Sequence, residues 1–174
     1  MMGLPVTPFL KNTRAAAAAE FALILPMAFA LVFTTMEAGY YFQTEHKAIK
    51  YVREGSRFAA RQNFAFFDCS GTGAFNNSAN NAATVLGRIQ NVTLTGQVSG
   101  GSARIADWEA TDINVSVQCD EDFATGLYAG TTDSKAPVVT VSTRFSYTPI
   151  VGRLGFDVSD IDVVAVAESP VAGI

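Results

Sequence analysis

Charged residues are scarce in this 174-residue sequence, where they make up 16% against a usual share of about a quarter. The shortage is concentrated in one stretch, because no charged residue lies between Glu20 and Glu37. The net charge of −4 is uneven too, since Lys11 and Arg14 contribute +2 near the amino terminus and leave −6 for the rest. A mildly acidic body argues against nucleic acid as the main partner, because phosphate binding requires a basic surface.

Residues with obvious chemical roles are also few. The single histidine, His46, has no further His, Cys or carboxylate ligands at helical spacing, so we interpret it as a surface residue. The acidic run "CDED" (Cys119–Asp122) lacks the alternation and the glycine of a calcium loop. The sequence shows no nucleophile elbow, no phosphate-binding glycine loop and no paired acids with a basic partner. We therefore expect neither an enzyme nor a bound cofactor or metal.

Cys69 and Cys119 are the two cysteines, and they lie far apart in the sequence. If this part of the chain is outside the cytoplasm, a disulfide is the simplest interpretation, and two buried thiols are the alternative. A bridge would close a loop of roughly fifty residues, for which chain-entropy estimates give about 4 kcal/mol.

The uncharged stretch "FALILPMAFALVFTTM" has the length of a membrane span. Together with Ala15–Ala19 it gives about 22 residues, which rise roughly 33 Å as a helix and cross a hydrocarbon layer of ~30 Å. Lys11 and Arg14 precede it and predict a cytoplasmic amino terminus, while the aromatic residues 40–42 follow it where an interfacial belt would lie. The sequence predicts one span, with the rest of the chain outside.

Three fates of this segment remain open from the residues alone. First, the segment is a secretory signal that is cut after Ala30, in the small-residue box "AFA". Second, it is an anchor that stays uncut. Third, cleavage occurs before the apolar run, so that the apolar helix stays on the mature protein. Glu20 favours the third fate, because a carboxylate inside the bilayer costs on the order of 3 kcal/mol and needs a partner. A cut between Ala15 and Ala16 frees an α-ammonium that can pair with Glu20 of a neighbouring subunit. Alternatively, the Glu20 side chain reaches interfacial water.

The stretches "TRAAAAAEFALILPMAFALVFTTMEAGYYF" and "AIKYVREGSRFAAR" resemble the TadE-like family of minor pilins, which belong to the tight-adherence (Tad, or Flp) pilus of bacteria. The resemblance covers roughly residues 12–61, and its features are Arg14, "EFAL" from Glu20, Pro26, Glu37 and "REGSRFAAR". It implies cleavage by an aspartic-type prepilin peptidase that leaves Glu20 as the fifth mature residue. Pilin cleavage sites usually have Gly before the cut, whereas this chain has alanines, so the spacing from Glu20 selects Ala15–Ala16.

The resemblance also implies partners and a role. Glu20 and Phe21 would take part in subunit pairing, and the partners would be major and minor pilins, the prepilin peptidase and inner-membrane platform proteins. The protein would assemble or prime a Tad-type pilus and so support adhesion and biofilm formation. The alternative is a single-span periplasmic scaffold or binding protein that never enters a filament.

Beyond the span, the sequence predicts that the helix continues to Gln62. Pro26 predicts a kink inside it, since proline removes a backbone hydrogen bond. One face of the continuation is small and apolar, with Gly55 as the expected closest contact to a sheet. Another face is basic and is interpreted either as a partner contact or as a solvated face. This basic stripe consists of Lys47, Lys50, Arg53, Arg57 and Arg61.

The remaining sequence predicts an α+β domain of the pilin-like kind. A short helix is expected within residues 78–90, and alternating apolar residues predict four antiparallel strands in "NVTLTGQV", "DINVSVQC", "PVVTVSTRFSYTP" and "DIDVVAVAES". "TPIVGRLG" is expected to form a helical turn between the last two strands. The predicted organisation is a cytoplasmic leader at 1–15, a transmembrane and extended helix at 16–62, and a periplasmic domain at 63–174.

Overall fold

The structure is a computed structural model that describes residues 13–76, 82–120, 126–130, 135–154 and 161–173. The chain divides after Tyr40 into two compact units, which are described separately below. Helix α1 (Thr13–Ala60) contributes to both units. The fold is α+β, as predicted: a long amino-terminal helix is followed by a domain built on an antiparallel sheet.

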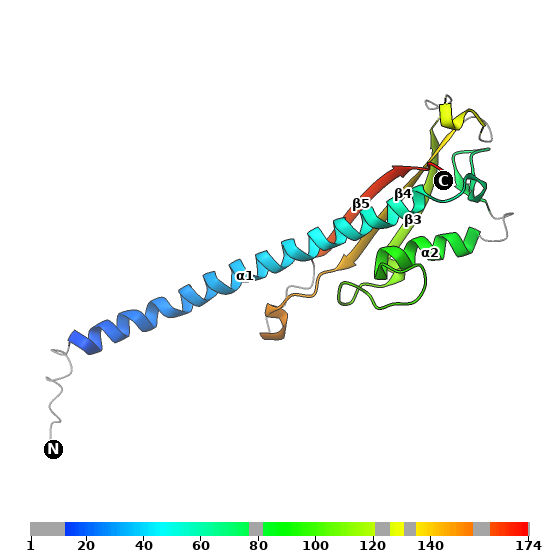
Figure 1. The fold of residues 1–174 in the computed structure, drawn as a ribbon. Helices are drawn as coiled ribbons and strands as arrows, with labels where there is room; N and C mark the ends of the chain where they lie inside the picture. Colours follow the sequence, from blue (N-terminus) through cyan, green and yellow to red (C-terminus); the bar gives the residue numbers. More distant parts are fainter. Residues whose placement is uncertain (1–12, 77–81, 121–125, 131–134, 155–160, 174) are drawn as a thin grey trace, which may run out of the picture. The chain divides into compact units, whose positions relative to one another are not determined.

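The main sheet of the second unit is a three-stranded meander in the order β3-β4-β5 (Figure 1). Its strands are β3 (Ile113–Asp120), β4 (Ala136–Ser146) and β5 (Asp162–Pro170). The register pairs Val117 with Val139 and Val141 with Ala167, so residues of the same face lie side by side. Along β4, side chains alternate between buried and less buried positions, which is the pattern of a sheet covered on one face.

Shorter elements complete the second unit. A two-stranded antiparallel ladder joins β1 (Phe67–Asp68) and β2 (Ala74–Phe75). Single 3₁₀ turns occur at Phe64–Phe66, Ala110–Asp112, Gly126–Gly130 and Val151–Leu154. The last of these confirms the helical turn predicted in "TPIVGRLG".

Helix α2 (Ala82–Thr95) corrects one of the four strand predictions. Residues 91–95 of "NVTLTGQV" belong to α2 and form no strand. The main sheet therefore has three strands, where the sequence predicts four. Val85, Ile89 and Thr93, spaced four residues apart, are fully buried along one face of α2. Burial of this face outweighs the β-propensity of Val92 and Thr93.

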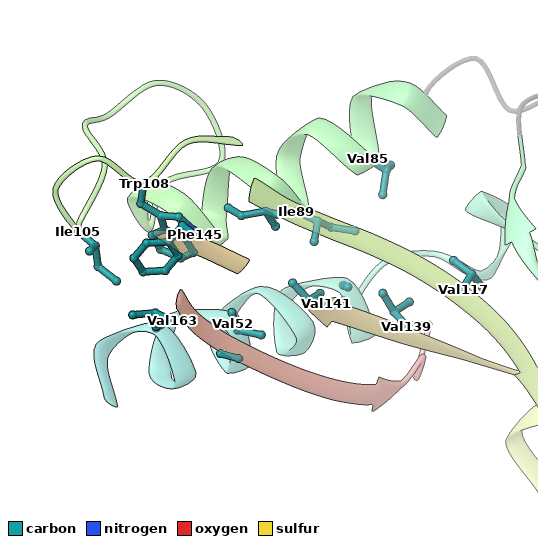
Figure 2. Close-up of a cluster of buried hydrophobic side chains, with 14 of the residues drawn as sticks. Val52, Val85, Ile89, Ile105, Trp108, Val117, Val139, Val141, Phe145 and Val163 are labelled. Carbon is teal, nitrogen blue, oxygen red and sulfur yellow. The ribbon is translucent and has the colours of Figure 1, made fainter. Parts of the chain in front are cut away.

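The core lies between one face of the sheet and the two helices (Figure 2). Valines from all three strands meet Val52 of α1 and Ile89 of α2 there. Trp108 closes one end of this cluster, with its ring 5.6 Å from that of Phe145. The indole Nε1–H donates to Thr143 Oγ1 at 2.8 Å, and that hydroxyl donates to the Asp112 carbonyl at 3.0 Å. The buried polar atoms are thereby satisfied.

The small face of α1 packs into this core as predicted, but its closest neighbour differs from the prediction. Ala48, Val52, Ser56 and Ala59 are buried, and Ser169 Oγ of β5 donates to Ser56 Oγ at 3.1 Å. The tightest approach, at Gly55, is to α2 and not to the sheet. A Cβ at Gly55 would overlap the hydroxyl oxygen of Thr93. Glycine thus allows the two helices to approach each other while both cover the sheet.

We predict that Gly55→Ala destabilises the folded domain by about 1–3 kcal/mol, because the added methyl group overpacks the contact with Thr93. Urea unfolding of the full chain in non-ionic detergent, followed by circular dichroism, measures the change. Gly87→Ala in α2 is the matched control. No atom lies within 4 Å of a Cβ built at Gly87, so the better helix propensity of alanine should be neutral or stabilising.

Adding Thr93→Ala to the Gly55→Ala protein removes the overlapping hydroxyl. We expect this second change to recover part of the lost stability. Equal unfolding midpoints for Gly55→Ala and Gly87→Ala would contradict the proposed close approach.

Candidate anchoring and subunit-pairing segment

The first unit consists of the apolar part of α1. Among the described residues, α1 is the one helix long and apolar enough to cross a membrane. None of its most apolar eighteen-residue window is buried inside the molecule. The large apolar side chains are exposed, with Phe21 at 64% and Leu23 at 77%. At 100° per residue, Phe21, Leu23 and Ile24 already point in three directions, so this part of the helix is apolar all round.

The hydroxyl groups in this segment are satisfied within the helix itself. Thr34 Oγ1 donates to the Ala30 carbonyl at 2.7 Å, and Thr35 Oγ1 lies 2.9 Å from the Val32 carbonyl. Such bonds remove the need for water, which is the requirement that a lipid environment imposes. α1 continues through Pro26 without a break in its assignment. The kink at Pro26 stays a prediction.

The predicted processing and pairing residues lie in the first turns of α1. The helix begins at Thr13, so the Ala15–Ala16 bond lies in its first turn. Ala16, Glu20 and Phe21 are exposed. Glu20 is four residues after Ala16, hence on the same helix face and about 6 Å further along the axis. The structure places these residues together, while cleavage and pairing remain predictions.

The basic stripe lies in the second unit, on the face of α1 opposite the small, buried face. All five of its side chains are exposed, and Arg61 lies directly after the end of the helix. Within the part of the chain that the structure describes, none of the five forms an ion pair. Lys50 Nζ lies 5.8 Å from the centre of the Tyr51 ring. The sequence therefore predicted the exposure of this stripe correctly, and its contact with a partner remains a prediction.

Glu54, the residue after Arg53 of the stripe, forms an ion pair outside α1 that the sequence did not predict. Arg104 forms an ion pair with Glu54, and its guanidinium lies 4.5 Å from the centre of the Tyr51 ring. The Arg104 backbone N–H also donates to the Leu94 carbonyl at 3.0 Å. Because the two charged partners are fifty residues apart, no local pattern in the sequence connects them.

The predicted disulfide is present. Cys69 and Cys119 are bonded, with their Cα atoms 5.6 Å apart, and they link the segment after β1 to strand β3. Beside it, Ser70 hydrogen bonds to the Asp68 carboxylate and holds the pKa of that group below its usual value of 3.8. These hydrogen bonds therefore stabilise the charged form of Asp68.

His46 is exposed, and the described residues contain no group of three or more potential metal ligands. Glu121 and Asp122 of "CDED" lie outside the described residues.

Comparison with known proteins gives one match, and it lies in α1. Residues 15–57 match the family described as TadE-like protein. This segment is similar to the TadE-like family. The match covers about a quarter of the 174 residues and includes Ala16, Glu20, Phe21 and Pro26. It also includes the basic stripe as far as Arg57. No curated protein and no solved structure matches the chain.

We predict that Cys69 and Cys119 of the protein isolated from its host react with an alkylating reagent only after reduction. Mass spectrometry of the alkylated protein measures this, and labelling of the non-reduced protein would contradict it. Replacing both cysteines by alanine should lower the free energy of unfolding by about 4 kcal/mol, because the bond closes a loop of fifty residues. Adding a reductant should lower the unfolding midpoint of the native protein but not that of the double variant.

Proposed function

We propose that this protein is a minor pilin, or pseudopilin, that assembles or primes a Tad-type pilus and so supports adhesion and biofilm formation. Its apolar helix spans the bacterial inner membrane once, with the amino terminus in the cytoplasm and the globular domain in the periplasm. A prepilin peptidase cuts between Ala15 and Ala16. Major and minor pilins and the membrane platform are its partners, and the proposal includes no enzymatic reaction.

The observation that carries this proposal is a helix that is apolar on all sides, TadE-like, and interrupted near its start by the carboxylate of Glu20. An apolar helix of this kind requires lipid or other apolar chains around it. Subunits that wait in lipid bury little new apolar surface when they associate, so helix shape and charge pairing decide which neighbours fit. Pairing of Glu20 also meets the cost of placing a carboxylate in the hydrocarbon layer.

The spacing of Ala16 and Glu20 suggests how neighbouring helices pair. After cleavage, the α-ammonium of Ala16 lies about 6 Å from the level of Glu20, which is roughly one helical turn. A neighbouring subunit displaced by about one turn brings its own α-ammonium to the level of this carboxylate. Phe21, exposed at 64%, follows Glu20 and is available to pack against that neighbour.

We predict that mature protein isolated from its host begins at Ala16. Amino-terminal sequencing or intact mass separates the three fates. An unprocessed start would support the anchored scaffold, and a start at Leu31 would support secretion of a soluble domain. Either result would contradict the pairing mechanism, because no α-ammonium would then lie one turn before Glu20.

We also predict that Glu20→Ala inserts into the membrane normally but reduces pilus assembly about tenfold, which corresponds to about 1.4 kcal/mol. The reduction follows from the loss of the pairing partner for the α-ammonium. Immunoblotting of membrane and sheared-pilus fractions measures both quantities. Glu20→Asp, which keeps the charge, should retain more assembly than Glu20→Ala. Normal piliation in Glu20→Ala would remove Glu20 from the mechanism.

A further inference from the structure

Charge is segregated within the second unit. Residues 41–62 carry five basic and two acidic side chains, a net charge of +3, whereas residues 63–174 carry five basic and twelve acidic ones, a net charge of −7. The basic stripe projects from α1 on the face opposite the core, so the chain's own acidic domain does not cover it. Of the two carboxylates of residues 41–62, Glu54 is engaged by Arg104.

Two exposed carboxylates, Asp107 and Asp162, lie at the end of the domain where Tyr41 is found. A third exposed carboxylate, Glu109, follows Asp107 by two residues. We call these three residues the acidic end. The Tyr41 hydroxyl donates to the Asp162 carbonyl at 3.4 Å, and the Tyr41 ring lies 5.3 Å from that of Tyr147. The next residue, Thr148, donates its hydroxyl to Asp107 Oδ2 at 2.9 Å.

The acidic end is only partly neutralised. Arg144 lies 3.4 Å from the Asp162 carboxylate, and both side chains are largely exposed. An ion pair of this kind contributes little, because solvent screens it. A negative surface therefore remains at one end of the domain, while a positive surface extends along α1 from Lys47 towards the other end.

We propose that the basic stripe is a docking surface for the acidic end of a second copy of this chain. Arg57 follows Lys47 by ten positions, so the part of the stripe within α1 extends about 15 Å along the helix axis. A parallel second copy displaced by about 18 Å, the rise from Tyr41 to Arg53, places its acidic end beside the middle of the stripe. Opposite charges over this length favour encounter and fix the register between copies.

The contact joins two different surfaces, the stripe of one copy and the acidic end of another. In a pair of parallel copies, one stripe and one acidic end therefore stay free to bind further copies. Such heterologous contacts propagate into an open, helical array and do not close. The contact deepens the proposed pilus function, and its role in a fibre rests on that function. The contact itself is measurable in solution without any pilus.

The test uses the full chain in non-ionic detergent, with sedimentation velocity at about 50 and about 300 mM NaCl, a range over which screening of exposed charges increases strongly. We expect wild-type protein to associate at the lower salt concentration and to dissociate about tenfold more readily at the higher one. The stripe variant carries Arg53→Glu and Arg57→Glu. The acidic-end variant carries Glu109→Lys and Asp162→Lys.

Each reversal places like charges at the contact, so each variant alone should associate at least about tenfold more weakly than wild type. Mixing the two variants restores opposite charges, and we expect the mixture to associate again. Arg88→Glu is the matched control for Arg53→Glu, because Arg88 is exposed on α2, away from the stripe. The single variant Arg53→Glu is measured beside it. Both single changes lower the net charge by two, and Arg88→Glu should associate like wild type.

A mixture that stays monomeric, or stripe variants that associate like wild type, would overturn the proposal. Wild-type protein that is monomeric at both salt concentrations, and that co-purifies with phosphatidylglycerol which the stripe variant loses, would assign the stripe to anionic lipid instead. Circular dichroism and an intact disulfide establish folding of each variant. Repeating the measurement in Glu20→Ala separates this contact from helix pairing: association there would support the docking surface even if Glu20 had no role in assembly.

Discussion

Helix α1 carries two different side-chain patterns along its length, and most of the structure follows from the change between them. In its first part, apolar side chains point in every direction and the threonine hydroxyls bond to the helix's own carbonyls. In its second part, one face is small and buried and the opposite face is basic and exposed. The side chains of a single helix thus change from a pattern suited to lipid to a pattern suited to a water-facing domain.

The water-facing part of α1 depends on close packing. Gly55 allows Thr93 of α2 to lie directly against α1, and Ser56 and Ser169 form a hydrogen bond between α1 and β5. Both α2 and strand β5 approach the same face of α1. That face therefore requires small residues. At one end of the core, Trp108 packs against Phe145, and the Thr143 hydroxyl oxygen accepts a hydrogen bond from the indole N–H of Trp108.

The sequence predicted those features that depend on local periodicity. The length of α1, the small and basic faces, the strands β3, β4 and β5 and the turn at Val151–Leu154 all followed from spacing. Residues 91–95 were assigned wrongly, because Val92 and Leu94 alternate like a strand while Val85, Ile89 and Thr93 satisfy a helical repeat. The local pattern was ambiguous, and burial against α1 decided it.

Features that depend on distant residues were harder to predict. The disulfide was found because two cysteines allow one intramolecular pairing, whereas Glu54 and Arg104 had many possible partners. The contact of Gly55 with Thr93 required knowledge of α2 and of its position. In the candidate site, the positions of Ala16, Glu20 and Phe21 followed from helical spacing, and their exposure agrees with it.

The covalent link between Cys69 and Cys119 has a consequence for when the domain becomes mature. Disulfides form in oxidising compartments and seldom in the cytoplasm. Under the topology proposed above, the domain is less stable while it is being synthesised, by about the 4 kcal/mol expected for a loop of this length. Oxidation after translocation would then act as a checkpoint. A chain that remains in the cytoplasm would lack the disulfide and would be cleaved more readily by proteases.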